Sequence, residues 1–242
     1  MLHVRMADMH RRAELRHLIS ATIHERLADQ GHEPLMKELA RLAGTSSALA
    51  VLGSQAGAAA MVAVSDRTAH AAHDLELVLA EGPETDAFGD TGPVLVAGPA
   101  LVSRWPRYGP AVAELGVQAV SAAPLGSGRT TFGAVCAFGC ATASQPAEPE
   151  RLATATTLMA DVLSGILLTE SDNFPAGDGL GILEIFSDGD LQSPIHQAIG
   201  AISAQGGYTI ADAGALLAAR AFADGRPVSE VARQVLLSEI RL

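Results

Sequence analysis

A short segment at residues 104–108 combines basic and aromatic side chains, a pattern that could bind a small molecule. Its sequence, RWPRY, contains the only tryptophan and one of the two tyrosines of the chain. Aromatic rings provide a large apolar area with a polar edge, and ligand pockets are commonly lined by such rings. We expect Arg104, Trp105 and Tyr108, together with Phe88, to form a ligand-binding wall. A structural plug over a sheet is the alternative.

The last fifty residues contain four arginines and no lysine. Contacts with phosphate would therefore fall to Arg220, Arg226 and Arg233, of which Arg226 is expected near a helix N-terminus, where backbone N–H groups favour phosphate. Four acidic residues balance the four arginines of this region, so its net charge is zero. Because phosphate binding normally requires a basic surface, an ordinary solvated helix face is the alternative.

Other residue types with chemical potential show no reactive pattern. The neighbours of Cys136 and Cys140 are mostly apolar, which predicts buried structural thiols, with a cysteine redox role as the alternative. His70 and His73 are expected in a polar loop beside Asp74, and the histidines lack metal-ligand spacing. We find no phosphate-binding loop, no GxSxG and no paired carboxylates in an apolar setting. We therefore expect no catalytic residue, metal or cofactor.

Composition predicts a cytoplasmic protein of one or two domains. The chain has 242 residues, 48% of them hydrophobic, and a formal net charge of −11. This charge argues against a general nucleic-acid binder or an anionic-membrane binder. Two cysteines without CxxC spacing indicate a reducing cytosol, and the N-terminus lacks the apolar segment of a signal peptide. The uncharged residues 44–65 are interpreted as two buried strands rather than a membrane helix.

Hydrophobic periodicity predicts an α+β domain over residues 1–169, with about six antiparallel strands flanked by helices. The expected helices cover residues 8–28, 34–43, 110–115 and 148–168, and the expected strands cover residues 48–52, 59–64, 75–79, 93–96, 117–123 and 132–138. The apolar stripe of the helix at 148–168 is wide enough for a core and a partner helix. We therefore expect a homodimer.

An acidic segment at residues 170–192 follows, with six acidic residues and no basic one. Its Gly, Asp and Pro content is typical of a linker. Beyond it, residues 193–242 read as three short helices, at 194–205, 211–223 and from 228 to the C-terminus, separated by glycine and proline. Their apolar stripes predict an all-α three-helix bundle.

The order HQAIG, A-x-x-x-L-x-x-x-A and F-A-x-G-R-P-x-S-x-V-A in this last region resembles the ANTAR domain, a three-helix RNA-binding module of bacterial transcription antiterminators. The matching positions are Gln197, Ala198, Gly200, Ala213, Leu217, Ala221, Val231 and Ala232. The position after Leu217, usually Arg in this family, is Ala218 here. The resemblance implies that Gln197, Arg220, Arg226 and Arg233 belong to an RNA-binding surface.

The middle of the chain resembles the GAF domain that precedes ANTAR in actinobacterial regulators. The resemblance lies in EGPETDAF, GPVLV, RWPRY, GVQAV, PLG and FGAV. Together the two resemblances imply a homodimeric regulator that senses a small molecule or protein and binds hairpin loops of nascent RNA to favour antitermination. The alternatives are a GAF-fold cysteine redox enzyme and a protein-interaction regulator that has lost RNA binding.

Overall fold

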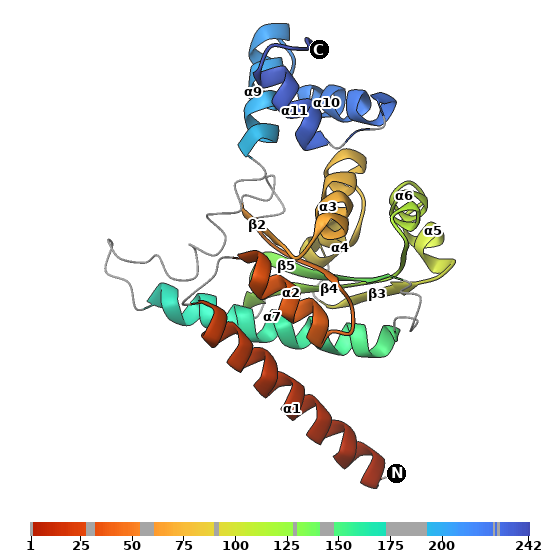
Figure 1. Ribbon diagram of the computed structural model, residues 1–242, viewed down its shortest axis with the longest axis vertical. Helices are drawn as coiled ribbons and strands as arrows, with labels where there is room; N and C mark the ends of the chain where they lie inside the picture. Colours follow the sequence, from red (N-terminus) through yellow and green to blue (C-terminus); the bar gives the residue numbers. More distant parts are fainter. Residues whose placement is uncertain are drawn as a thin grey trace.

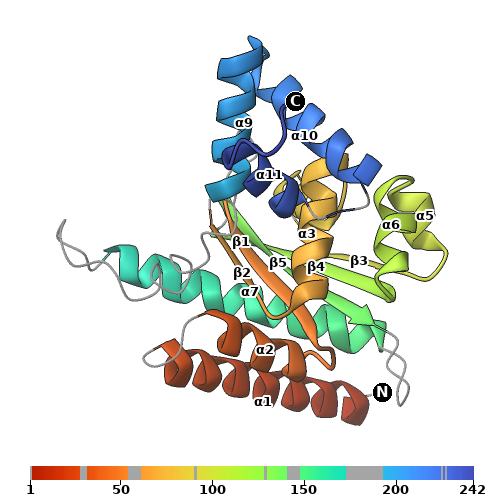
Figure 2. The same cartoon turned by 45° about the horizontal axis from the view of Figure 1, so that its top comes forward.

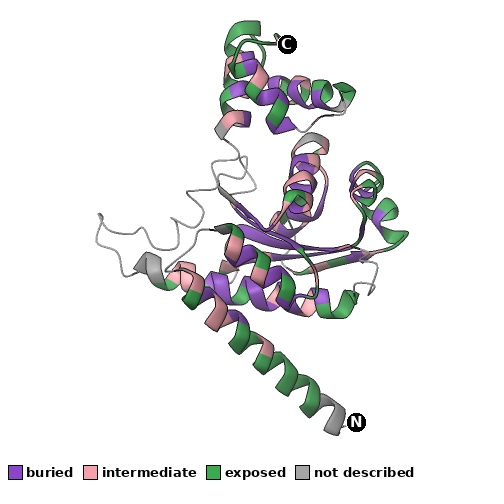
Figure 3. Cartoon of the chain, viewed as in Figure 1, coloured by how far each residue is buried: buried purple, intermediate pink, exposed green. Residues whose placement is uncertain are grey.

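The computed structural model describes residues 2–27, 32–53, 61–89, 92–127, 130–140, 148–172, 193–224, 226 and 228–242. Within them, an antiparallel sheet with helices on both faces is followed by three helices that pack around a core of their own (Figure 1). Buried residues concentrate on the strands and on the helix sides that face them (Figure 3). The predicted antiparallel sheet flanked by helices is therefore confirmed.

The described part of the sheet has five strands, not about six, in the order β2-β1-β5-β4-β3, and each neighbouring pair is antiparallel. The strands are β1 (Ser47–Leu52), β2 (Met61–Val64), β3 (Val94–Ala97), β4 (Val117–Ser127) and β5 (Thr130–Cys140). Side chains alternate between two cores, as Val135 and Cys136 show. Because both faces of the central strands are covered, their sequences are rich in apolar residues, which is why the sequence located all five strands.

Three helices lie on one side of the sheet: α2 (His32–Leu42) and α7 (Pro149–Asp172) pack on it, and α1 (Leu2–Leu27) packs on these two helices. Ile19 and Ile23 of α1 are fully buried in this layer, and Leu163 of α7 is 2% exposed. The apolar stripe that was expected to meet a partner helix thus lies largely within the chain. By length and composition, the stretch Pro149–Thr169 of α7 is apolar enough to cross a membrane, but more than half of it is buried in the protein.

Four helices cover the other face: α3 (Arg67–Leu79), α4 (Pro83–Gly89), α5 (Ala100–Arg104) and α6 (Tyr108–Glu114). The predicted strand at residues 75–79 is wrong, because those residues form the end of α3. Asp66 caps this helix by accepting a hydrogen bond from the Ala69 backbone N–H at 2.9 Å. Helices α4 and α5 were not predicted.

Three helices form the C-terminal bundle: α9 (Ser193–Gly206), α10 (Ile210–Asp224) and α11 (Val228–Leu236). The predicted cap Thr209 accepts from the Asp212 backbone N–H at 3.1 Å, and its hydroxyl donates to the Asp212 carboxylate. Contrary to prediction, α11 stops at Leu236, and Ser238 beyond it has a φ of 60°. The linker was expected at residues 170–192, but residues 170–172 form the end of α7, and residues 173–192 lie outside the described residues.

Candidate functional site

The predicted ligand wall comes together where α4, α5 and α6 meet. The rings of Trp105 and Tyr108 pack edge to face, with centroids 5.7 Å apart, and both residues are buried. The Trp105 indole N–H donates to the Asp86 carboxylate at 3.1 Å, and Arg104 Nε donates to the same oxygen at 2.9 Å. Phe88 packs against the same core, and Arg104 is exposed. The two buried rings thus fill the core on this face, as the structural alternative requires.

Beneath these rings lies a buried polar cluster formed by His73 and Glu76 of α3 and Glu84 of α4. The side chains of His73 and Glu84 are at most 7% exposed. Counted as whole residues, all three are at most 5% exposed. His73 Nδ1 lies 2.8 and 2.9 Å from the two Glu84 carboxylate oxygens. Glu76 accepts hydrogen bonds from the backbone N–H groups of Glu84, at 3.0 Å, and Thr85, at 2.6 Å. Glu76 therefore holds the first turn of α4 against α3.

The turn between the two helices brings the carboxylates together. Ala80 adopts the left-handed conformation at the end of α3, with φ 51°. A Cβ at Gly82 would lie 2.6 Å from the Glu76 carboxyl carbon, so only glycine allows this approach. The prediction that no paired carboxylates occupy an apolar setting is wrong. His73 also lies in a helix and is buried, not placed in a polar loop.

Burial determines where protons reside in this cluster. Desolvation, together with the nearby Glu84 carboxylate, raises the pKa of Glu76 to about 8. Burial opposes a charge on His73, but the Glu84 carboxylate outweighs it, with help from Asp74 and Glu76, and the pKa of His73 is raised. These shifts favour a proton on Glu76 and a charge on His73 beside the Glu84 carboxylate, an arrangement that makes burial in an apolar layer more tolerable than three unprotonated groups would be.

Two further polar groups face this cluster. Burial, followed by the carboxylates of Glu76 and Glu84, raises the pKa of the Tyr108 hydroxyl well above its usual value. Among the described residues, this hydroxyl has no hydrogen-bond partner. The same causes raise the pKa of the Cys136 thiol. The cluster can hold a proton, but it offers no activated nucleophile.

The second cysteine is also a poor nucleophile. Cys140 is half-buried, with its sulfur 3.9 Å from the Ser47 hydroxyl. Burial raises the pKa of Cys140 despite this hydrogen bond, and the Asp66 carboxylate raises it further. Neither cysteine therefore favours the thiolate at neutral pH, which argues against the redox alternative. Across the described ranges, no group of three His, Cys, Asp or Glu side chains is arranged to hold a metal ion.

The predicted RNA-binding residues are distributed over the C-terminal bundle. Gln197 is exposed on α9, and Arg220 on α10 pairs with Asp224 at 2.7 Å. Arg226 lies just before α11 and donates to Glu230 at 2.6 Å and to Gln234 at 2.7 Å. Arg233 is exposed on the same helix. The structure thus brings Arg226 and Arg233 to one helix, while Gln197 and Arg220 occupy the other two.

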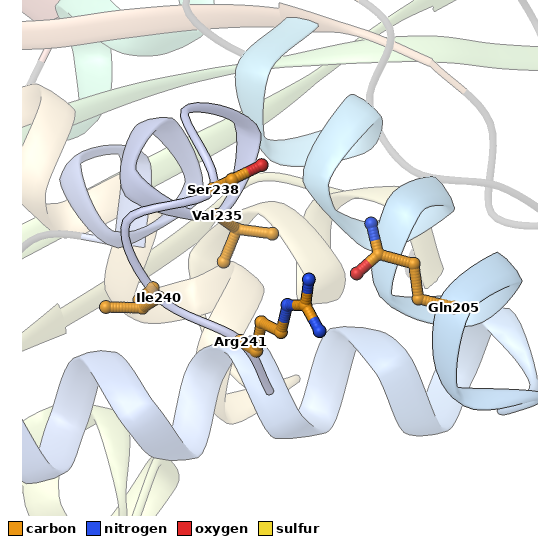
Figure 4. Close-up of a pocket in the computed structure, with 5 residues that line it drawn as sticks. All are labelled: Gln205, Val235, Ser238, Ile240 and Arg241. Atoms are coloured by element: carbon orange, nitrogen blue, oxygen red, sulfur yellow. The ribbon is translucent and has the colours of Figure 1, made fainter.

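A hollow in the bundle also bears on where a ligand could sit. It has a volume of about 310 Å³ and lies between the end of α9 and the C-terminal tail. Its lining residues are Gln205, Val235, Ser238, Ile240 and Arg241 (Figure 4). Arg241 and Gln205 extend into it from opposite sides. Sequence reasoning did not find this hollow, because its residues come from two distant segments.

Comparisons with known proteins add little at the level of function. No protein-family model matches the chain, and no curated protein matches it. Among solved structures, it is similar to the GAF domain of a protein described as a sensor histidine kinase from Pseudomonas syringae pv. tomato. The two are 15% identical, with a TM-score of 0.36, over 69% of this chain and 95% of that one. No family membership is assigned from these comparisons.

Proposed function

We propose that this protein is a cytoplasmic sensor–effector regulator. The sheet domain responds to a small-molecule or protein signal, and the C-terminal bundle binds hairpin loops of nascent RNA and promotes transcription antitermination. Loops are the suitable target because their unstacked bases are accessible to side chains, unlike the deep major groove of duplex RNA. No catalytic step, cofactor or metal is needed for this role.

The observation that carries the proposal is that the bundle contains both a buried core of ANTAR-like positions and a surface with arginines that could contact RNA. The positions shared with ANTAR domains are mainly core residues, including Ala198, Ala213, Leu217, Val231 and Ala232, each 0% exposed. They account for the helix packing and leave recognition to the surface. There, Arg226 lies just before the first turn of α11, and Arg233 lies in its last turn. A guanidinium group beside a helix N-terminus, as at Arg226, suits phosphate, because the helix dipole and the free N–H groups act in the same direction.

A protein-interaction role is the second candidate, favoured by the internal ion pairs of the bundle. Arg220 is neutralised by Asp224 and Arg226 by Glu230, so little net positive potential remains for RNA. A homodimer would place two sets of arginines on one assembly and strengthen RNA binding without new residues. We include that homodimer in the proposal.

The test is a filter-binding titration at several salt concentrations, with RNA recovered from native pull-downs of the protein. Arg226→Ala and Arg233→Ala should each weaken binding and lower the salt slope by about one unit, because each removes one phosphate contact. Arg12→Ala, an exposed arginine on α1, is the matched control and should leave both quantities unchanged. If both bundle variants bind as well as the wild type, the protein-interaction role replaces the RNA-binding one.

A further inference from the structure

Helix α3 is buried on two sides. One side, with Ala69, Ala72, His73 and Glu76, faces the sheet and α4. The other side meets the C-terminal bundle, because α10 and α11 both contact α3 and Leu77 packs against the bundle core. Figures 1 and 2 show the bundle seated beside α3 in two orientations. The two halves of the chain therefore meet through this helix.

Asp74 lies on the side of α3 that faces α11. It is 4% exposed, and among the described residues neither of its carboxylate oxygens completes a hydrogen bond. On α3, His70 Nε2 lies 3.7 Å from one of these oxygens. On α11, the backbone N–H of Ser229 and the guanidinium of Arg233 lie close enough to favour the charged carboxylate. Asp74 therefore points at the first turn of α11.

That position is one that a phosphate would take. The first N–H groups of a helix have no partner within the helix, and an anion placed there is stabilised by the groups and by the dipole. Ser229, at the second position of α11, is 4% exposed in this arrangement, so α3 shields the site from solvent. Arg226 donates to Glu230 of the same turn, and the guanidinium of Arg233, from the last turn of α11, acts on Asp74. An RNA phosphate and the Asp74 carboxylate would thus compete for one place.

We propose that the first turn of α11, with Arg226 and Arg233, is a phosphate-binding site, and that Asp74 occupies it as an internal substitute while Leu77 holds the bundle on α3. Release of α3 opens the site. The inference rests on the proposed function only for the claim that the phosphate belongs to RNA. A second structural feature makes release feasible: a buried carboxylate without complete hydrogen bonds is costly, so the docked state is easily opened. Burial also raises the pKa of Asp74, in spite of the cations that face it.

The test separates docking from binding. Leu77→Glu places a charge against the bundle core and should release the bundle. Release should increase the radius of gyration in small-angle scattering and amide exchange over residues 228–232. Thr68→Glu adds the same charge in the first turn of α3, where an acidic residue is tolerated, and should change neither. Unchanged Trp105 fluorescence in both variants verifies that the sheet domain is folded.

Binding is then measured by titration calorimetry with inorganic tripolyphosphate. If the bundle is free only about a tenth of the time, Leu77→Glu should bind about tenfold more tightly than the wild type. Adding Arg233→Ala to Leu77→Glu should remove this gain. The proposal is overturned if Leu77→Glu leaves the dimensions and exchange of the wild type unchanged, or if the released bundle binds tripolyphosphate no better.

A separate comparison tests the RNA assignment. Released Leu77→Glu is titrated with a fluorescein-labelled RNA hairpin and with a DNA duplex of the same length. A preference for the hairpin supports the RNA-binding function. Tight tripolyphosphate binding without that preference supports the phosphate site and overturns only the proposed function.

Discussion

The buried carboxyl of Glu76 should make the stability of the sheet domain fall as pH rises. In the unfolded chain this group loses its proton near its usual pKa of 4.5, whereas in the folded protein the pKa is about 8. Between these values the folded state binds more protons than the unfolded state, so the free energy of unfolding decreases with pH. The contribution is fully present below the usual pKa and is lost once pH exceeds about 8. His73, whose pKa is also raised, acts in the same direction above its usual pKa of 6.5.

The expected size follows from proton linkage. One proton corresponds to a slope of about 1.4 kcal/mol per pH unit, and the slope is halved where pH reaches the folded pKa of about 8, so Glu76 alone should remove about 2 kcal/mol of stability between pH 6 and pH 8. This is a large part of the free energy of unfolding of a typical domain, which is roughly 5–15 kcal/mol. Glu76→Gln should abolish that part of the slope. At pH 6 the variant should be about 1–3 kcal/mol less stable than the wild type, since an amide cannot accept from both backbone N–H groups.

The assay is urea unfolding at several pH values, followed by the fluorescence of Trp105. This is the only tryptophan of the chain and it is 2% exposed, so its emission reports on the fold around the cluster. Glu81→Gln is the matched control, because backbone hydrogen bonds from Tyr108 and Arg107 lower the pKa of Glu81 and it does not titrate in this range. Equal urea midpoints at pH 6 and pH 8 in the wild type would refute the reasoning. So would an unchanged slope in Glu76→Gln.

Three further substitutions test the packing. Leu217→Ala, at the centre of the bundle core, should destabilise the bundle by about 2–5 kcal/mol, measured by circular dichroism during thermal unfolding. Leu163→Glu should prevent folding of the sheet domain, seen as loss of soluble yield, because it buries an unpaired charge costing several kcal/mol. Gly109→Ala should cost about 1–3 kcal/mol in urea unfolding, since its Cβ would lie 2.4 Å from the Leu101 carbonyl oxygen, whereas Gly92→Ala, with open space around it, should be neutral.

Each of these expectations has a result that contradicts it. A Leu217→Ala variant with the wild-type transition would mean that the bundle core is not cooperative. Soluble, folded Leu163→Glu would mean that α7 does not pack on the sheet as described. Equal urea midpoints for Gly109→Ala and Gly92→Ala would exclude the close approach of α6 to α5.

Local sequence pattern predicted the strands well, and for a physical reason. Both faces of β4 and β5 are covered, so their residues are apolar almost without interruption and stand out from the surrounding turns. It failed at residues 75–79, where LELVL alternates like a strand although it ends α3. Pro83, at the first position of α4, is a typical helix start that would have separated α3 from a new helix.

The candidate site was harder to predict because it depends on pairing across a turn. RWPRY was recognised, but the groups beneath it were not. Glu76 and Glu84 are eight residues apart, and only the reversal of the chain at Ala80 and Gly82 brings them together. In the sequence, a glutamate whose carboxyl group is buried and protonated cannot be distinguished from one whose carboxylate is solvated. Its environment, which comes from distant strands, decides the difference.

The contacts of α3 on two sides explain why its sequence is atypical of a surface helix. An amphipathic surface helix has one apolar stripe and one polar face, but α3 has buried polar groups on both of its contact sides. On the sheet side, His73 and Glu76 bond to α4; on the bundle side, Asp74 faces α11. Neither side can be a continuous apolar stripe, so the helical period is obscured. Natural sequences depart from local consistency mainly where function requires it. The helix that sequence pattern misassigned is therefore the one that joins the proton-holding cluster to the proposed phosphate site.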